Sequence, residues 1–201
     1  MRALPATYRL RGRGDGFVRG KASSETLLDA YLVASARLGD RQAFALLVRR
    51  WNGRLLAHAW RLLGDAEQAR DAVQDGWGEI VKGLPRLADA DAFPAWAYRI
   101  VSRRAARLIE RLRRERRLNE TIEQEPWTPH SEAGHVGADA ERLRRAIAAL
   151  PAGQRAAIAL FYLEDMSVAE VAVALDVPAG TVKTRLMNAR AKLRAVLEGE
   201  S

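Results

Sequence analysis

Apolar residues recur at helical spacing along most of the chain, and no run alternates between apolar and polar positions as a half-buried strand does. The spacing is clearest between residues 40 and 64, where apolar side chains three and four positions apart would share one helix face: Phe44, Leu47, Val48, Trp51, Leu55 and Leu56. Aspartate and glycine stand where helix caps are needed. The sequence therefore predicts an all-α fold.

Capping residues divide the first half of the chain into four predicted helices, with approximate ranges 24–38, 40–64, 65–82 and 91–117. The expected N-caps of the last three are Asp40, Asp65 and Asp91, and a loop over residues 84–90 precedes the fourth helix. Gly76 and Gly78 are expected to weaken the second half of the third helix, because each costs about 1 kcal/mol relative to alanine.

Charge is unevenly distributed and indicates how the chain is organised. Residues 1–24 carry six Lys or Arg against one Asp, which favours a disordered basic tail. Residues 118–141 carry six acidic and no basic residues and predict a flexible acidic linker. Helical patterns on either side predict two small helical domains, over residues 25–117 and 142–198.

Residues 167–197 predict two helices separated by a break at residues 176–178, which is a helix-turn-helix. On the second helix the inward positions are Val182, Leu186, Ala189 and Leu193. The opposite face carries Thr184, Met187, Asn188 and Ala191, with Lys183, Arg190, Arg185 and Lys192 on its flanks. Cations beside a small or polar face suit a major groove, whereas an ordinary bundle helix with a solvated charged face is the alternative.

Residues 93–117 carry nine Arg and two Glu, a net charge of +7 in 25 residues. Phe93, Trp96 and Tyr98 come just before most of these arginines, and aromatic rings beside guanidinium groups hold unstacked bases of single strands. Ordinary core packing remains the alternative for Phe93 and Trp96. The pattern favours a polyanionic partner.

Composition narrows the classes of function. The 201 residues include 33 Lys or Arg against 25 Asp or Glu, a formal net charge of +8, which favours nucleic acid as a partner. The absence of cysteine excludes disulfides and thiolate zinc sites. No apolar run is long enough for a membrane span, so we expect a cytoplasmic protein without a cofactor.

Both halves together resemble the extracytoplasmic-function (ECF) sigma factors of bacterial RNA polymerase, over about residues 27–197. Residues 39–77 are similar to the family's polymerase-docking region, residues 93–114 to the segment that melts the promoter's minus-10 element, and residues 149–194 to its minus-35 reader. The resemblance implies core RNA polymerase and promoter DNA as partners, with duplex DNA at minus-35 and a single strand at minus-10. It also implies an anti-sigma protein.

The resemblance assigns roles to particular residues. The expected polymerase-binding residues are Asp71, Val73, Gln74 and Asp75. The expected DNA-binding residues of the basic segment are Trp96, Tyr98, Arg99, Arg103, Arg104 and Arg107. Those of the second domain are Thr181, Lys183, Thr184, Arg185, Met187, Asn188 and Arg190. Arg103 and Arg107 depart from the family, which often has Asn and Asp there, so the family's base preference is not carried over.

Two other classes of protein were weighed. A helix-turn-helix regulator acting without polymerase would need only residues 142–198, and the first half has no recognisable ligand pocket. An all-helical enzyme is disfavoured because the three histidines, His58, His130 and His135, have no partners at catalytic or metal-binding spacing, and no glycine-rich phosphate loop occurs. We therefore expect no enzymatic activity.

Overall fold

The computed structural model describes residues 24–118 and 138–198, and within these ranges every regular element is a helix. The elements are α1 (Ser24–Arg37), α2 (Arg41–Leu63), α3 (Ala66–Gly83), η1 (Leu84–Arg86), η2 (Ala90–Ala92), α4 (Phe93–Leu118), α5 (Ala138–Ala148), α6 (Ala152–Tyr162), α7 (Val168–Leu175) and α8 (Ala179–Glu198). The all-α prediction is confirmed. None of the described helices is long and apolar enough to cross a lipid bilayer.

The caps expected for α2 and α3 are formed. The Asp40 carboxylate accepts hydrogen bonds from the backbone N–H groups of Gln42 and Ala43, at 2.8 and 3.1 Å. The Asp65 carboxylate accepts one from the N–H of Gln68 at 2.8 Å. Each such cap contributes about 1 kcal/mol to helix stability. The positions at which these helices begin therefore follow from local sequence.

The expected cap of α4 is wrong. Asp89, not Asp91, is the capping residue: its carboxylate accepts from the N–H of Asp91 at 2.9 Å and opens η2, which continues directly into α4. The expected acidic linker also ends earlier than predicted, because α5 already begins at Ala138. Residues 119–137 of that linker, and residues 1–23 of the expected tail, lie outside the described residues.

Helix α3 runs unbroken through its two internal glycines, so the expected weakening of its second half is not seen. Gly76 is buried against α4, and a Cβ atom there would lie only 3.1 Å from a methyl group of Val101. At Gly83 a Cβ atom would lie 2.7 Å from the Trp96 ring. Gly76 and Gly83 therefore allow α4 to approach α3 closely, and this packing offsets the low helix propensity of glycine at these two positions.

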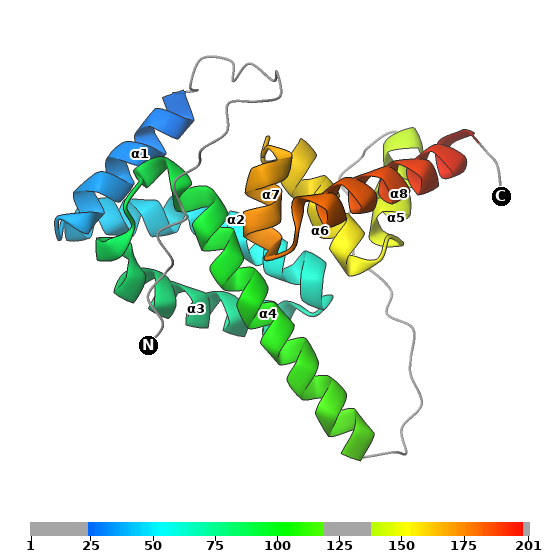
Figure 1. Ribbon diagram of the computed structural model, residues 1–201, viewed down its shortest axis with the longest axis horizontal. Coiled ribbons are helices and arrows are strands. Elements are labelled where there is room, and N and C mark those ends of the chain that lie inside the picture. Colours follow the sequence, from blue (N-terminus) through cyan, green and yellow to red (C-terminus); the bar gives the residue numbers. More distant parts are fainter. Residues whose placement is uncertain (1–23, 119–137, 199–201) are drawn as a thin grey trace.

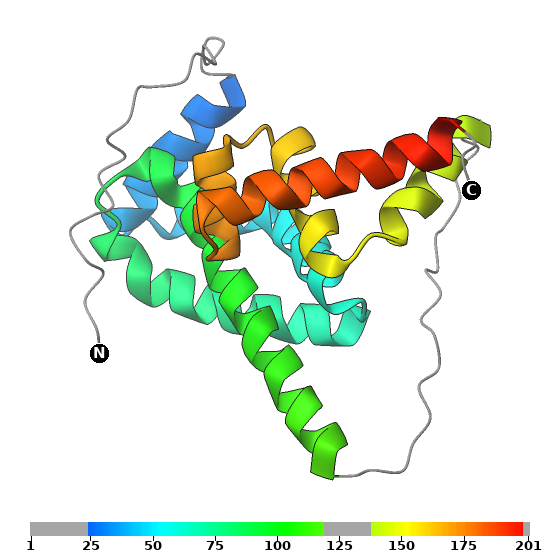
Figure 2. The same cartoon turned by 45° about the vertical axis from the view of Figure 1, so that its right-hand side comes forward.

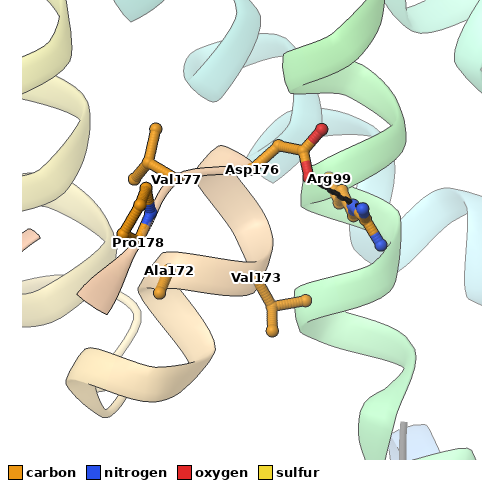
Figure 3. Close-up of a pocket in the computed structure, with 6 residues that line it drawn as sticks. All are labelled: Arg99, Ala172, Val173, Asp176, Val177 and Pro178. Carbon is orange, nitrogen blue, oxygen red and sulfur yellow. Dashed lines mark hydrogen bonds and ion pairs between the residues drawn. The ribbon is translucent and has the colours of Figure 1, made fainter. Parts of the chain in front are cut away.

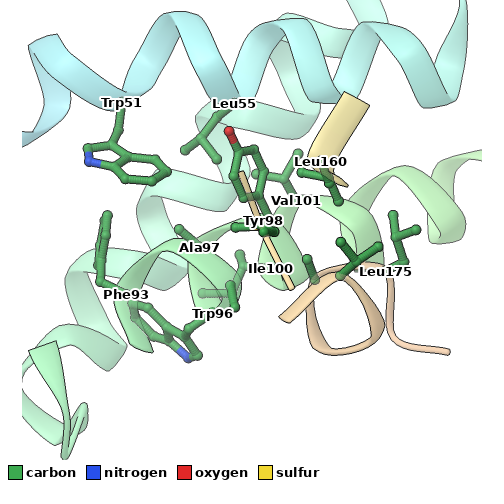
Figure 4. Close-up of a cluster of buried hydrophobic side chains, with 14 of the residues drawn as sticks. Trp51, Leu55, Phe93, Trp96, Ala97, Tyr98, Ile100, Val101, Leu160 and Leu175 are labelled. Atoms are coloured by element: carbon green, nitrogen blue, oxygen red, sulfur yellow. The ribbon is translucent and has the colours of Figure 1, made fainter. Parts of the chain in front are cut away.

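The two halves of the chain pack directly on each other. Helix α7 lies against α4, and α6 lies against α2, as Figures 1 and 2 show from two directions. Figure 4 shows that the core is continuous across this contact: Tyr98 and Ile100 of α4 lie beside Leu160 of α6 and Leu175 of α7. We call this the closed arrangement, and it places the helix-turn-helix on the first half of the basic helix.

A buried arginine links the halves through backbone oxygens. The Arg155 guanidinium on α6 donates to the carbonyl of Arg61, near the end of α2, from two nitrogens at 2.8 and 3.1 Å. It also donates to the carbonyl of Ala148, the last residue of α5, at 2.6 Å. Unpaired carbonyls at helix ends are natural partners for a cation. A second link is the ion pair between Arg54 of α2 and Glu164, at 3.5 Å.

Candidate nucleic-acid interface

The helix-turn-helix is organised by two local motifs. The Ser167 hydroxyl accepts from the N–H of Glu170 at 3.2 Å, and the Glu170 carboxylate accepts from the N–H of Ser167 at 2.8 Å, which is a complete capping box at the start of α7. Helix α7 ends at Asp176, whose φ of 54° and ψ of 44° are left-handed. The turn therefore reverses the chain with an aspartate where glycine would be unstrained.

Helix α8 presents the face expected from its periodicity. Val182, Leu186 and Ala189 are buried, as predicted, and Leu193 is half-buried against the same core. The opposite positions are exposed; we call Lys183, Thr184, Met187 and Asn188 the α8 face. Met187 exposes 62% of its surface. This face is open to a duplex even in the closed arrangement.

Two of the expected DNA-binding arginines of α8 are held by α6 and the turn after it. The Arg190 guanidinium donates to the Tyr162 hydroxyl at 2.8 Å and lies 5.7 Å from the centre of the Phe161 ring. Arg185 is half-buried over the start of α6, where a Cβ atom on Gly153 would lie 3.0 Å from its Cζ. Tyr162 is thus a site residue that sequence reasoning missed, because it is 28 positions from its partner.

The aromatic residues of α4 are buried. Tyr98 exposes 1% and Trp96 7% of their surfaces. The Trp51 ring of α2 lies edge-on at 5.3 Å from Phe93 and 5.8 Å from Tyr98, centre to centre. Core packing, the alternative for Phe93 and Trp96, is what the closed arrangement shows, because α2 and α7 both cover the first half of α4. Burial, together with Glu164, raises the pKa of Tyr98 above its usual value.

The four α4 arginines that were expected to bind DNA all face carboxylates. Arg99 lies 2.7 Å from Asp176 at the turn of the helix-turn-helix (Figure 3), and Arg103 lies 3.8 Å from the same carboxylate. Arg104 pairs with Asp75 and with Glu79 of α3. The remaining member, Arg107, lies 3.8 Å from Glu79. In the closed arrangement the first half of α4 is thus electrostatically satisfied within the chain.

The second half of α4 is different. It extends beyond the packed helices, as Figure 2 shows, and its Arg111, Arg113 and Arg114 are exposed. Arg111 and Arg114 pair with a glutamate one turn away, Glu115 and Glu110 respectively. Exposed pairs within one helix contribute little. This half therefore keeps its positive field available to a polyanion.

A groove lies between α2 and α3. It has a volume of about 520 Å³, and its lining residues are Phe44, Val48, Asn52, Leu56, Arg70, Val73, Gln74, Trp77, Gly78 and Val81. Of the expected polymerase-binding residues, Asp71, Gln74 and Asp75 are exposed, whereas Val73 exposes only 2% of its surface at the groove floor. A groove with apolar walls and polar residues at its edge is typical of a site that receives part of another protein.

His58 lies fully buried beneath α4. Its Nε2 atom lies 2.8 Å from the Ser102 hydroxyl oxygen, and its ring centre is 5.0 Å from that of Tyr98. Burial, with the nearby charge of Arg61 as the second cause, lowers the pKa of His58 to about 3. The histidine is therefore packed in its neutral form, and among the described residues no three His, Asp or Glu side chains gather as metal ligands do.

Comparison with known protein families gives two matches. The model described as Sigma-70 region 2 matches residues 47–117, and the model described as Sigma-70, region 4, matches residues 140–193. The ECF RNA polymerase sigma factor SigM of Mycobacterium tuberculosis is 34% identical, covering 84% of this chain and 84% of that protein. The RNA polymerase sigma-H factor of Pseudomonas aeruginosa is 29% identical, covering 85% of this chain and 94% of that protein.

Two solved structures are similar in fold. Sigma factor RpoE, solved in complex with the anti-sigma factor NepR from Bartonella quintana, superposes with a TM-score of 0.64 at 23% identity, covering 79% of this chain and 98% of that one. CnrH, solved in complex with the cytosolic domain of CnrY, has a TM-score of 0.57 at 31% identity, covering 87% of this chain and 99% of that one.

Proposed function

The chain belongs to the ECF family of RNA polymerase sigma factors, and on this premise we propose which of its surfaces bind polymerase and promoter DNA. As a member of the family it recognises promoters and directs RNA polymerase to them. Such proteins are not enzymes in general, and we propose no catalytic activity for this one. We place it in the cytoplasm, where its template and polymerase are.

The α8 face is the proposed minus-35 reader. It is carried by a helix whose opposite side is buried in the domain core, and it combines a methionine, a threonine and an asparagine with a cation. Side chains of these types reach base edges and phosphates in a major groove. The exposure of this face is the observation that carries the proposal.

Replacing Lys183 with alanine should lower the salt dependence of duplex binding. Each phosphate contact contributes about 0.9 to the slope of log K against log salt concentration, so the slope should fall by about that amount. Fluorescence anisotropy of the chain on a labelled duplex from 50 to 300 mM salt measures it. Lys82→Ala is the matched control, because Lys82 is an exposed cation on α3. Equal slopes for the two variants would show that Lys183 makes no phosphate contact.

Helix α4 is the proposed binding surface for the promoter's minus-10 element, where it contacts a single strand. Support comes from its arginine density and from the exposed second half, which offers an electrostatic track for a strand. Tyr98 packs on Trp51 and His58 of α2, and Trp96 packs against Gly83 of α3, so these rings would reach a base only if contacts within the first half also open. The arginines Arg99, Arg103, Arg104 and Arg107 would then exchange carboxylate partners for phosphates.

The groove between α2 and α3 is the proposed docking site for core RNA polymerase. Its apolar floor and the exposed Asp71, Gln74 and Asp75 support this assignment. Val73 shapes the floor of the groove and is not proposed to offer a free surface. An anti-sigma partner is proposed as well, since the sigma factor RpoE was solved with the anti-sigma factor NepR, and CnrH with the cytosolic domain of CnrY.

Replacing Asp71 and Gln74 together with alanine should weaken binding to core polymerase roughly tenfold or more, since interface residues of this kind carry 1–2 kcal/mol. Surface plasmon resonance on immobilised core enzyme measures the change. A double control, Gln42→Ala with Asp91→Ala, removes the same residue types from exposed positions away from the groove. Wild-type affinity in the Asp71 and Gln74 variant would remove the assignment.

The function itself is tested by transcription. Purified chain is added to core polymerase lacking any sigma factor, with a library of genomic templates from the source genome, and new transcripts are sequenced. Defined start sites that share upstream elements are expected. A duplex-binding regulator would instead bind its sites equally well without polymerase and start no transcripts.

A further inference from the structure

We propose that Asp176 takes the place of a DNA phosphate within the chain. In the closed arrangement its carboxylate pairs with α4 arginines that would otherwise bind the promoter strand. The pair therefore favours the closed arrangement of the free chain, which binds single-stranded DNA less tightly. The α8 face stays exposed to duplex DNA in this arrangement. The inference rests on the proposed role of α4 and goes beyond it, because it concerns how that role is withheld until the halves separate.

The geometry of the pair is the first support. Asp176 Oδ1 accepts from Arg99 Nη2 at 2.7 Å and from Nε at 3.0 Å, a charge-assisted contact of two donors with one oxygen that a phosphate oxygen could also accept (Figure 3). The other oxygen, Oδ2, lies 3.8 Å from Arg103 Nε. One carboxylate thus engages two successive turns of the basic helix, as a strand phosphate would.

The backbone at Asp176 is the second support. Asp165 and Asp176 are the two non-glycine residues with positive φ in the described part of the chain, at 50° and 54°. Glycine adopts this conformation without strain, so an aspartate here costs stability in the turn itself. At position 176 the aspartate makes a contact with the other half of the molecule that glycine could not make. Asp165 is exposed and takes part in no described ion pair, which makes it a natural control.

The way α7 lies on α4 is the third support. Val171, Ala174 and Leu175 of α7 are buried in the closed arrangement, and the first half of α4 is buried with them. At the edge of this contact a pocket of about 390 Å³, open to solvent, is lined by Arg99, Val173 and Asp176 among others. The ion pair therefore lies at the solvent-exposed edge of the contact and not in its apolar centre, so it can bias the closed arrangement without being its main source of stability.

The size of the effect sets what to expect. The side chains of Arg99 and Asp176 are 23% and 43% exposed, and pairs this exposed shift an equilibrium by up to about fivefold. Asp176 therefore biases the closed arrangement without locking it.

The test compares Asp176→Asn and Asp176→Gly with Asp165→Asn and Asp165→Gly in the full chain. The first substitution of each pair removes only the charge, and the second also removes the left-handed strain. Because the chain has no cysteine, Ala45→Cys on α2 and Ala191→Cys on α8 give unique sites for spin labels. Pulsed electron resonance without DNA then reports the distance between the halves, and anisotropy reports binding of a 20-nucleotide single strand.

Both Asp176 variants should broaden the distance distribution and bind the single strand three- to fivefold more tightly, with unchanged duplex affinity. The Asp165 variants should match the wild type in all three measurements. Arg99→Glu alone and Asp176→Arg alone should each broaden the distance distribution. The double variant, in which the two charges are exchanged, should restore the narrow distribution of the wild type. Identical distances and strand affinities in the Asp176 variants and the wild type would overturn the proposal. Promoter-directed transcription by the wild-type chain would stand independently of that result.

Discussion

Replacing Arg155 with methionine is expected to lower the free energy of unfolding by about 3 kcal/mol. The guanidinium is 9% exposed and donates to the carbonyls of Arg61 and Ala148, which methionine would leave without a donor. Methionine fills similar volume, so the loss reports the hydrogen bonds more than a cavity. Urea denaturation followed by circular dichroism measures it, and the loss should fall on both halves, because Arg155 joins them.

Two controls accompany this variant. Arg142→Met removes an exposed arginine from α5 and should change the stability by less than about 0.5 kcal/mol. Arg155→Lys keeps the charge but not the planar fork, so it should recover only part of the loss. A stability of Arg155→Met within 1 kcal/mol of the wild type would mean that water replaces the guanidinium at both carbonyls.

Lowering the pH from 6.5 to 4.5 should destabilise the protein by about 2 kcal/mol through His58 alone. The unfolded chain binds a proton on this histidine below its ordinary pKa of 6.5, whereas burial lowers the pKa in the folded state to about 3. Stability is therefore fully present above pH 6.5 and is lost by about 1.4 kcal/mol per pH unit as the pH falls toward 3. Denaturant melts at half-unit intervals measure the slope.

The comparison variant is His58→Gln, which keeps a group able to bond the Ser102 hydroxyl but does not titrate in this range. The difference in slope between the two proteins isolates the histidine, because carboxylates contribute equally to both. Parallel pH profiles would show that the folded state accepts the imidazolium, as it would if the closed arrangement let water reach the ring.

Local chemistry determined what could be predicted from sequence. Asp40 and Asp65 cap their helices with bonds that span two or three residues, and the buried side of α8 follows from helical period alone. Asp89 and Asp91 both stand before α4, and local rules do not choose between them, because aspartate is a favoured cap at either position; the bond that forms is from the Asp91 N–H to the Asp89 carboxylate. The inserted 3₁₀ turn decides in favour of Asp89.

Contacts between the halves were beyond sequence reasoning. Arg99 and Asp176 are 77 positions apart, and Arg155 and Arg61 are 94 apart, with no pattern in either segment that names its partner. The burial of Trp96 and Tyr98 could not be predicted for another reason: apolar and aromatic residues serve a core as well as they serve a nucleic-acid base. Here Trp51 and His58 of α2 pack on Tyr98, and Gly83 of α3 lies against Trp96, so the core of the first half takes both rings.

Because Gly83 lies so close to the Trp96 ring, substitutions at positions 83 and 96 should be correlated in evolution. Any side chain at 83 would displace the indole, whose ring atoms lie 2.7 Å from where a Cβ would stand. Alanine or serine at position 83 should therefore occur together with a residue smaller than tryptophan at position 96. Tryptophan at position 96 should occur together with glycine at position 83. In an alignment of homologues the pair should covary, and chains that break the rule should carry a bent junction between α3 and α4.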